Sequence, residues 1–163
     1  MPKLYTTKND LPEATRTKVI ALFNARLADS VDLQTQVKQA HWNVKGPDFI
    51  ALHELFDKIN EDVEEYVDLT AERVVQLGGT AEGTARLAVK SSRLPEYPLE
   101  IAAGHEHVDA LSSVLAAYGK LARAAIDEVD KLGDKDSADI FTEISRGVDK
   151  WLWFLEAHLQ SNR

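Results

Sequence analysis

The sequence predicts an all-α fold, in which four long helices form a bundle and one long crossover joins the second helix to the third. Two observations support this prediction. Apolar residues recur at helical spacing along most of the 163 residues, whereas no segment alternates between apolar and polar residues and β-branched residues are sparse. Clusters of glycine and proline then divide the apolar pattern into four segments, each long enough to form a helix.

The first two predicted helices occupy the N-terminal half of the chain. The first covers residues 12–44, because Pro12 suits an opening helical turn and the Lys-Gly-Pro sequence at 45–47 stops a helix. The second begins after Asp48, a residue type that caps helices, and ends at the glycine pair 78–79. The apolar faces are formed by Val19, Leu22, Phe23, Leu27, Val31 and Val37 in the first helix and by Leu52, Leu55, Phe56, Ile59, Val63, Tyr66 and Val67 in the second.

The crossover and the last two helices complete the predicted bundle. Residues 80–98 contain glycine and two prolines and are expected to form the long connection, followed by helices over about 99–132 and 137–160. A long connection between the second and third of four helices matches the ferritin-like topology rather than a simple up-and-down bundle. We therefore expect a single ferritin-like domain over residues 1–163, with residues 1–12 as a short N-terminal tail.

Composition narrows the possible functions. The formal net charge is −8, from 27 acidic and 19 basic residues, which opposes non-specific binding to nucleic acid and favours attraction of cations. The chain has no cysteine, so it forms neither disulfides nor thiolate metal sites. It has no apolar stretch long enough to cross a membrane and no apolar block of a secretory signal near its start. A cytoplasmic location is therefore the default expectation, with association with the nucleoid left open.

The usual metal motifs of helical bundles are missing. Di-iron bundles take ligands from Glu-x-x-His pairs within one subunit, and neither this motif nor His-Glu-x-x-His occurs in the chain. The residues three positions before the five histidines are Lys38, Ile50, Ala102, Gly104 and Leu155. If the protein binds iron, its site must therefore be built differently.

The second predicted helix carries an alternative set of ligands. His53 and Asp57 lie four positions apart, as do Asp68 and Glu72, so each pair shares a helix face. The eleven steps from Asp57 to Asp68 return to within about 20° of the same direction, so all four side chains lie on one side. Such a stripe is often only a solvated surface, and this interpretation stays open on spacing alone.

A second copy of the chain would turn this stripe into metal sites. Asp57 and Asp68 are about 16 Å apart along the helix axis, too far to bind one ion in the same chain. If the helix packs antiparallel against its own copy, the His53 end of one chain faces the Asp68 end of the other, and each interface holds two identical sites. His41, at the end of the first helix, would join the His53 end.

The ligand types favour a borderline divalent metal. Imidazole and carboxylate groups suit iron, and carboxylates stabilise Fe(III) relative to Fe(II), which favours oxidation of a bound ferrous ion. Zinc or manganese, without oxidation activity, remains an alternative because these ligand types do not exclude them.

Three segments resemble the Dps family, the DNA-binding proteins from starved cells, which are mini-ferritins. Residues 39–57 (QAHWNVKGPDFIALHELFD) resemble the family's main signature, and residues 68–79 (DLTAERVVQLGG) resemble its second signature in register. Residues 145–156 (SRGVDKWLWFLE) resemble its C-terminal helix. The similarity covers nearly the whole chain.

This resemblance implies a hollow dodecamer whose subunits oxidise Fe(II), preferentially with hydrogen peroxide, and store ferric mineral, so that DNA is protected from oxidative damage. By position, it implies that His41, His53 and Asp57 of one subunit bind the iron together with Asp68 and Glu72 of its two-fold mate. Trp42 matches a tryptophan near the iron site, and we count it among the candidate catalytic residues, with packing at the interface as the other interpretation.

The resemblance also bears on DNA. Many DNA-binding members carry a lysine-rich N-terminal extension, whereas only residues 1–4 precede the matching Tyr5 in this sequence. Together with the acidic charge, this predicts little or no direct DNA binding. A structural DNA-packing protein whose metal centre is secondary is the competing hypothesis.

Overall fold

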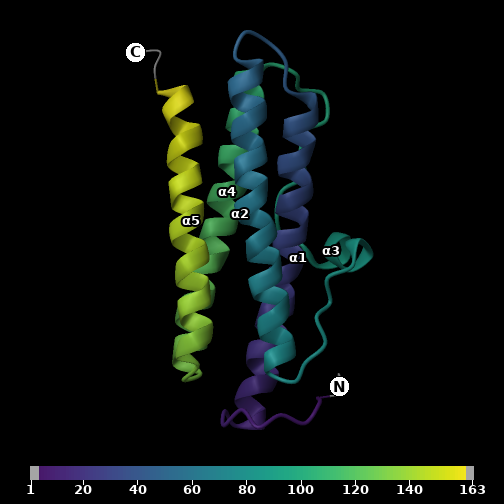
Figure 1. The fold of residues 1–163 in the computed structure, drawn as a ribbon, viewed down its shortest axis with the longest axis vertical. Helices are drawn as coiled ribbons and strands as arrows, with labels where there is room; N and C mark the ends of the chain where they lie inside the picture. The colour runs from purple at the N-terminus through teal and green to yellow at the C-terminus, as the bar shows by residue number, and fades with distance from the viewer. Residues whose placement is uncertain (1–3, 161–163) are drawn as a thin grey trace.

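The fold is all-helical, as predicted. The computed structural model describes residues 4–160, which form four long helices and one short helix and contain no β-strand (Figure 1). In this range no helix is both long and apolar enough to cross a membrane. The helices are α1 (Glu13–Asn43), α2 (Phe49–Gln76), α3 (Ala85–Ser91), α4 (Gly104–Lys131) and α5 (Lys135–Leu159).

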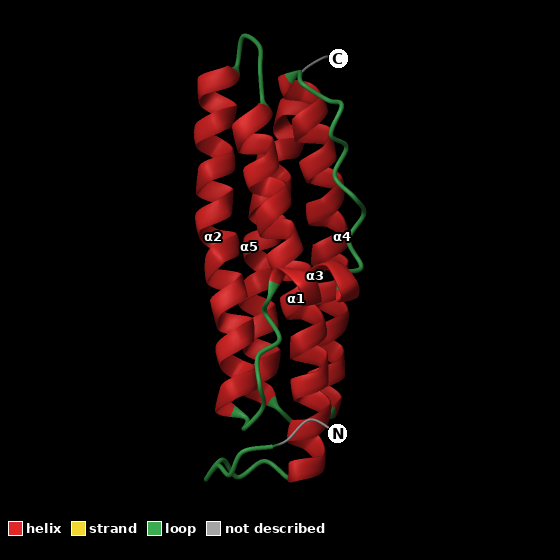
Figure 2. Cartoon of the chain, turned by 90° about the vertical axis from the view of Figure 1, so that its right-hand side faces the viewer, coloured by secondary structure: helices red, strands yellow, loops and turns green. Residues whose placement is uncertain are grey.

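The long helices pack as two hairpins, α1 along α2 and α4 along α5, with further contacts between α1 and α4. Helices α2 and α4 run in the same direction, so the connection between them must return along the whole bundle. Figure 2 shows this connection on the outside of the bundle, with α3 partway along it. This is the predicted ferritin-like topology.

The residue types at the end of α1 and at the start of α5 explain where these two helices stop and begin. Gly46 has a φ of +115°, a conformation that side chains with a Cβ rarely adopt, and Pro47 follows it, so α1 ends just before them. Asp134 caps α5 by accepting a hydrogen bond from the Ser137 N–H at 3.1 Å. Asp48 does stand at the N-cap of α2, but its side chain makes no capping hydrogen bond.

The structure corrects three details of the predicted helices. The crossover contains α3, which was not expected, and α5 begins at Lys135 rather than at residue 137. Helix α4 begins at Gly104 rather than at residue 99. The Glu106 carboxylate accepts hydrogen bonds from the N–H groups of Ala102 and Ala103, at 3.1 and 2.9 Å, and so fixes the later start.

Buried polar groups on α1 hold the crossover against the bundle. Asp29, fully buried, accepts a 2.7 Å hydrogen bond from the Arg93 N–H and pairs with Arg26 at 2.7 Å. Burial raises the pKa of Asp29, while these two partners oppose the rise. One turn further along α1, Asp32 accepts a 2.6 Å hydrogen bond from the Ser92 hydroxyl. The crossover therefore follows α1 and leaves the outer face of α2 uncovered.

A second buried ion pair ties the C-terminal end of α2 to the start of α5. The Arg73 guanidinium lies 2.7 Å from the Asp134 carboxylate and donates a 2.9 Å hydrogen bond to the Ser137 hydroxyl. Removing one partner would leave a buried charge unpaired, which costs far more than the pair itself contributes. The two hairpins are thus locked together at this end.

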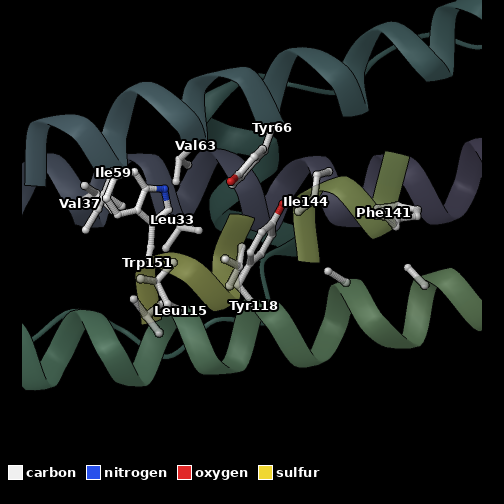
Figure 3. Close-up of a cluster of buried hydrophobic side chains, with 14 of the residues drawn as sticks. Leu33, Val37, Ile59, Val63, Tyr66, Leu115, Tyr118, Phe141, Ile144 and Trp151 are labelled. Atoms are coloured by element: carbon white, nitrogen blue, oxygen red, sulfur yellow. The ribbon is translucent and has the colours of Figure 1, made fainter. Parts of the chain in front are cut away.

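The core between the hairpins combines aliphatic side chains with large aromatic ones, among them Tyr66, Tyr118, Phe141 and Trp151 (Figure 3). Tyr118 is almost fully buried, and its hydroxyl lies 2.7 Å from that of Ser30. Trp151 donates a 2.7 Å hydrogen bond from its indole N–H to the carboxylate of Asp62 on α2. The Tyr118 hydroxyl and the Trp151 indole N–H therefore both have hydrogen-bond partners, which polar atoms of buried aromatic residues require.

Gly147 on α5 is required by the close approach of Tyr66. A Cβ at position 147 would overlap the Tyr66 hydroxyl, and the ring carbon Cζ would lie only 3.0 Å away. We expect Gly147→Ala to lower the free energy of unfolding by about 1–3 kcal/mol, because the tyrosine must shift out of its packed position. In a Tyr66→Phe background the cost should be smaller, since the overlapping oxygen is gone. Chemical denaturation of the four proteins measures this, and equal costs in both backgrounds would contradict it.

Candidate metal centre

His41 and His53 bind each other's backbone. His41 lies in the last turn of α1 and His53 near the start of α2. The Nδ1 atom of each ring lies 2.8 Å from the main-chain oxygen of the other residue. The two rings stack with their centres 3.7 Å apart and their planes 22° from parallel. This reciprocal pairing joins the two helices beside the turn that connects them.

These hydrogen bonds fix which ring nitrogen carries the proton. A carbonyl oxygen only accepts, so each Nδ1 must be the protonated nitrogen. In the neutral ring, the lone pair is then on Nε2, which is the atom that can bind a metal ion. Histidine ligands of metals commonly donate their other N–H to a backbone carbonyl in this way. Each ring therefore keeps its Nε2 atom free of these two hydrogen bonds.

Asp57 places a carboxylate next to the histidines. Its Oδ1 atom lies 3.8 Å from the Nδ1 of His41 and accepts a 2.8 Å hydrogen bond from the Lys38 ammonium. The hydrogen bond from Lys38 holds the pKa of Asp57 below its usual range, so the carboxylate is ionised at neutral pH. The side chain of Asp57 is half exposed. One chain thus brings His41, His53 and Asp57 together.

Asp68 and Glu72 lie elsewhere on the same helix. Both are exposed, and the helical rise separates Asp68 from Asp57 by about 16 Å. Asp68 borders a hollow of about 540 Å³ whose other lining residues include Glu61, Glu64 and Glu65. Within residues 4–160 of a single chain, no three histidine, aspartate or glutamate side chains are arranged to hold a metal ion. Each chain therefore carries two separate half-sites, one of histidines with Asp57 and one of carboxylates.

Trp42 lies on the surface of the bundle. It is 67% exposed, although it is next to the buried His41. The Lys38 ammonium lies 5.9 Å from the centre of its ring. Trp42 also lines a groove of about 840 Å³ between α1 and the crossover, together with the exposed side chains of Val89 and Leu99. A large apolar surface beside a half-site is typical of a contact with another protein chain.

The reasoning from sequence missed the part that Lys38 plays. The sequence shows Lys38 three residues before His41, but it was considered only as a position where the Glu-x-x-His motif lacks its glutamate. The contact with Asp57 depends on how α1 packs against α2, which spacing within one helix does not reveal. The reciprocal bonds of the two histidines were missed for the same reason.

Comparison with known proteins places the chain in one family. A family model described as a ferritin-like domain matches residues 20–163. The DNA protection during starvation protein of Agrobacterium fabrum is 48% identical over 158 residues, which cover 97% of this chain and 98% of that protein. Among solved structures, Mycobacterium smegmatis Dps in its tetragonal form has a TM-score of 0.91 at 32% identity and covers 96% of both chains. DpsA14 from Streptomyces coelicolor has a TM-score of 0.92 at 32% identity, covering 99% of this chain and 95% of that one.

The pairing of the two histidines should be measurable as stability in the metal-free protein. We expect His41→Ala and His53→Ala each to lower the free energy of unfolding by about 1–2 kcal/mol, because each removes one partly buried hydrogen bond. The double variant should lose less than the sum by about 0.5–1.5 kcal/mol, because the stacking energy is lost only once.

Chemical denaturation with a chelator present, at one subunit concentration, measures these differences. His105→Ala, at an exposed position on α4, is the control and should change stability by less than about 0.5 kcal/mol. Strictly additive effects of the two substitutions would show that the rings do not stabilise each other.

Proposed function

Because this chain belongs to the Dps family of ferritin-like proteins, we propose that it is a ferroxidase that oxidises Fe(II) at sites shared between two copies of the chain and stores the ferric product inside a hollow homo-oligomeric shell. One observation carries the proposal: the histidine half-site, where α1 meets α2, and the carboxylate half-site, further along α2, are not joined within the described residues of a single chain. The family membership and the names of its relatives, which refer to DNA protection during starvation, support it.

An antiparallel pair of α2 helices would complete both half-sites at once. A two-fold axis crossing α2 midway between Asp57 and Asp68 brings the histidine end of one helix to the carboxylate end of the other. Each site then contains His41, His53 and Asp57 from one chain and Asp68 and Glu72 from its mate. The exposed groove beside Trp42 would be covered by the same contact, which gives the apolar side chains a partner.

The proposed ligands suit the chemistry of iron oxidation. Two neutral imidazoles bind Fe(II), and the three carboxylates stabilise the higher charge of Fe(III). With hydrogen peroxide as the oxidant, one molecule takes one electron from each of two Fe(II) ions and, with two protons, gives two molecules of water. This stoichiometry releases no hydroxyl radical, so iron and peroxide are removed together and DNA is protected without direct contact. The preference for peroxide rests on the family resemblance.

Subunit mixing tests whether the site is shared. His41→Ala and Asp68→Ala should each reduce the initial rate of Fe(II) oxidation by about tenfold or more, because loss of even an outer-shell partner commonly has that effect. If the two variants are unfolded and reassembled together, half of the pairs will be mixed, and each mixed pair regains one intact site. The mixture should then show about a quarter of the activity of the unsubstituted protein.

A matched mixture controls this experiment. His41→Ala and His53→Ala remove ligands from the same half-site, so their mixed pairs contain no intact site and should stay inactive. Activity of the first mixture no higher than the mean of its two components would show that the site is not shared between chains.

Direct DNA binding is the competing function, and charge argues against it. At a net charge of −8 per chain, an assembly repels the phosphate backbone. We expect little or no gel shift of duplex DNA at pH 7 and low salt. A variant with a lysine-rich extension added at its N-terminus serves as the positive control. A strong shift of the unsubstituted protein, weakening steeply as salt rises, would contradict the expectation.

A further inference from the structure

The second half of the crossover, from α3 to the start of α4, is fixed to the bundle near each of its ends. It runs along the outside of the bundle (Figure 2). At one end, the side-chain amide of Gln36 donates a 2.9 Å hydrogen bond to the Pro95 oxygen. At the other, the Lys45 N–H donates a 2.9 Å hydrogen bond to the Ala102 oxygen. Between these points, within the described part of the chain, residues 96–101 make one hydrogen bond.

That hydrogen bond joins Tyr97 of the crossover to His107 of α4. The tyrosine oxygen lies 2.6 Å from Nδ1 of the histidine, and the two rings are 18° from parallel with their centres 6.0 Å apart. His107 is only 1% exposed, and its other ring nitrogen, Nε2, is buried beside the main chain of Asn43. Burial raises the pKa of Tyr97, so the hydroxyl keeps its proton. The neutral histidine ring accepts that proton in a hydrogen bond at Nδ1.

Protonation of His107 would break this arrangement. An imidazolium ion has an N–H on both nitrogens, so Nδ1 can no longer accept a hydrogen bond from the Tyr97 hydroxyl. Burial of the ring lowers the pKa of His107, because the charged form loses its hydration. Two charged side chains face the ring: Glu106 opposes this fall in pKa, and Lys45 adds to it. The Glu106 carboxylate is bound to two main-chain N–H groups at the helix start, not to His107.

Tyr97 belongs to the walls of two hollows on the surface. It lines the groove of about 840 Å³ beside Trp42 and also a hollow of about 570 Å³ bordered by Ile101, His105 and Leu159. The position of the Tyr97 ring therefore sets the shape of both hollows. Its release would alter the groove that the contact between two chains covers. This last consequence rests on the proposed function, whereas the contact of Tyr97 with the buried histidine does not.

We propose that the Tyr97–His107 contact is a pH-sensitive switch, which holds residues 96–101 against α4 while His107 is neutral and releases them when His107 is protonated. The released form binds the proton more tightly, because its histidine is hydrated. The contact is therefore fully formed above about pH 6.5, the ordinary pKa of a hydrated histidine. Below that pH, the equilibrium constant for release rises by about tenfold per pH unit until the lower pKa of the closed form is reached.

Proteolysis of the assembled, iron-free protein tests the switch. Glu96 and Glu100 lie in the segment that is released, so a protease that cleaves after glutamate reports how often the segment opens. The cleavage rates at about pH 7.5 and about pH 5.5 are divided by the rates on a free peptide of residues 92–103, which removes the pH dependence of the protease. We expect the normalised rate of the unsubstituted protein to be about tenfold higher at the lower pH.

Three variants make the result specific. His107→Gln keeps an amide that can pair with the Tyr97 hydroxyl but does not titrate, so its normalised rate should differ by less than about twofold between the two pH values. His105→Gln, at an exposed position on the same helix, should keep the rise of about tenfold. Tyr97→Phe removes the hydrogen bond and should be cleaved about fivefold faster than the unsubstituted protein at the higher pH.

Each outcome decides for or against the switch. If acid does not speed cleavage of the unsubstituted protein, or if His107→Gln responds to acid just as strongly, the role of His107 is overturned. A Tyr97→Phe protein that is cleaved no faster at the higher pH would show that this hydrogen bond does not hold the crossover. Circular dichroism checks that each variant is folded, and the Tyr97→Phe result decides alone if His107→Gln does not fold.

Discussion

The course of the crossover along α1 is the constraint on which the rest of the structure depends. Since α2 and α4 run in the same direction, the chain must return along the full length of the bundle before α4 begins. Buried Asp29 and its partners Arg26 and Arg93 decide which helix the returning chain follows. Had the connection lain over α2 instead, it would have covered the polar stripe on that helix. The candidate metal ligands are accessible to a second chain because the crossover packs elsewhere.

The same few atoms support both the fold and the candidate site. The hydrogen bonds between the histidine rings and the opposite carbonyls close the α1–α2 hairpin. They also fix the tautomer that leaves Nε2 for a metal ion. In the proposed site, a substitution at either histidine would therefore change stability and metal affinity together. Asp68 and Glu72 contribute nothing comparable to packing, since both are exposed on α2.

Local sequence signals were sufficient to predict the four long helices, but they predicted neither α3 nor the contacts between distant elements. Gly46 with Pro47 acts within a few residues of itself, and the predicted end of the first helix agrees with the structure there. At the start of α4, the local cap formed by Glu106 acts together with a contact between distant residues, the 2.9 Å hydrogen bond from the Lys45 N–H to the Ala102 oxygen. No local pattern encodes that contact. The same holds for the two half-sites. Spacing within the sequence predicts which residues share a face of α2. The contact of Lys38 with Asp57 depends instead on how α1 packs against α2.

The core of the described residues also contains no sulfur. The chain has no cysteine, and its single methionine is Met1, so alanine, branched aliphatic and aromatic side chains form the core. Thioethers and thiols are the groups that peroxide attacks most readily, and a methionine sulfoxide in a core disrupts its packing. A protein that meets peroxide and iron at its own surface would lose its fold gradually if such groups filled its interior. The composition of the bundle therefore protects it from the chemical damage that its proposed reaction serves to limit.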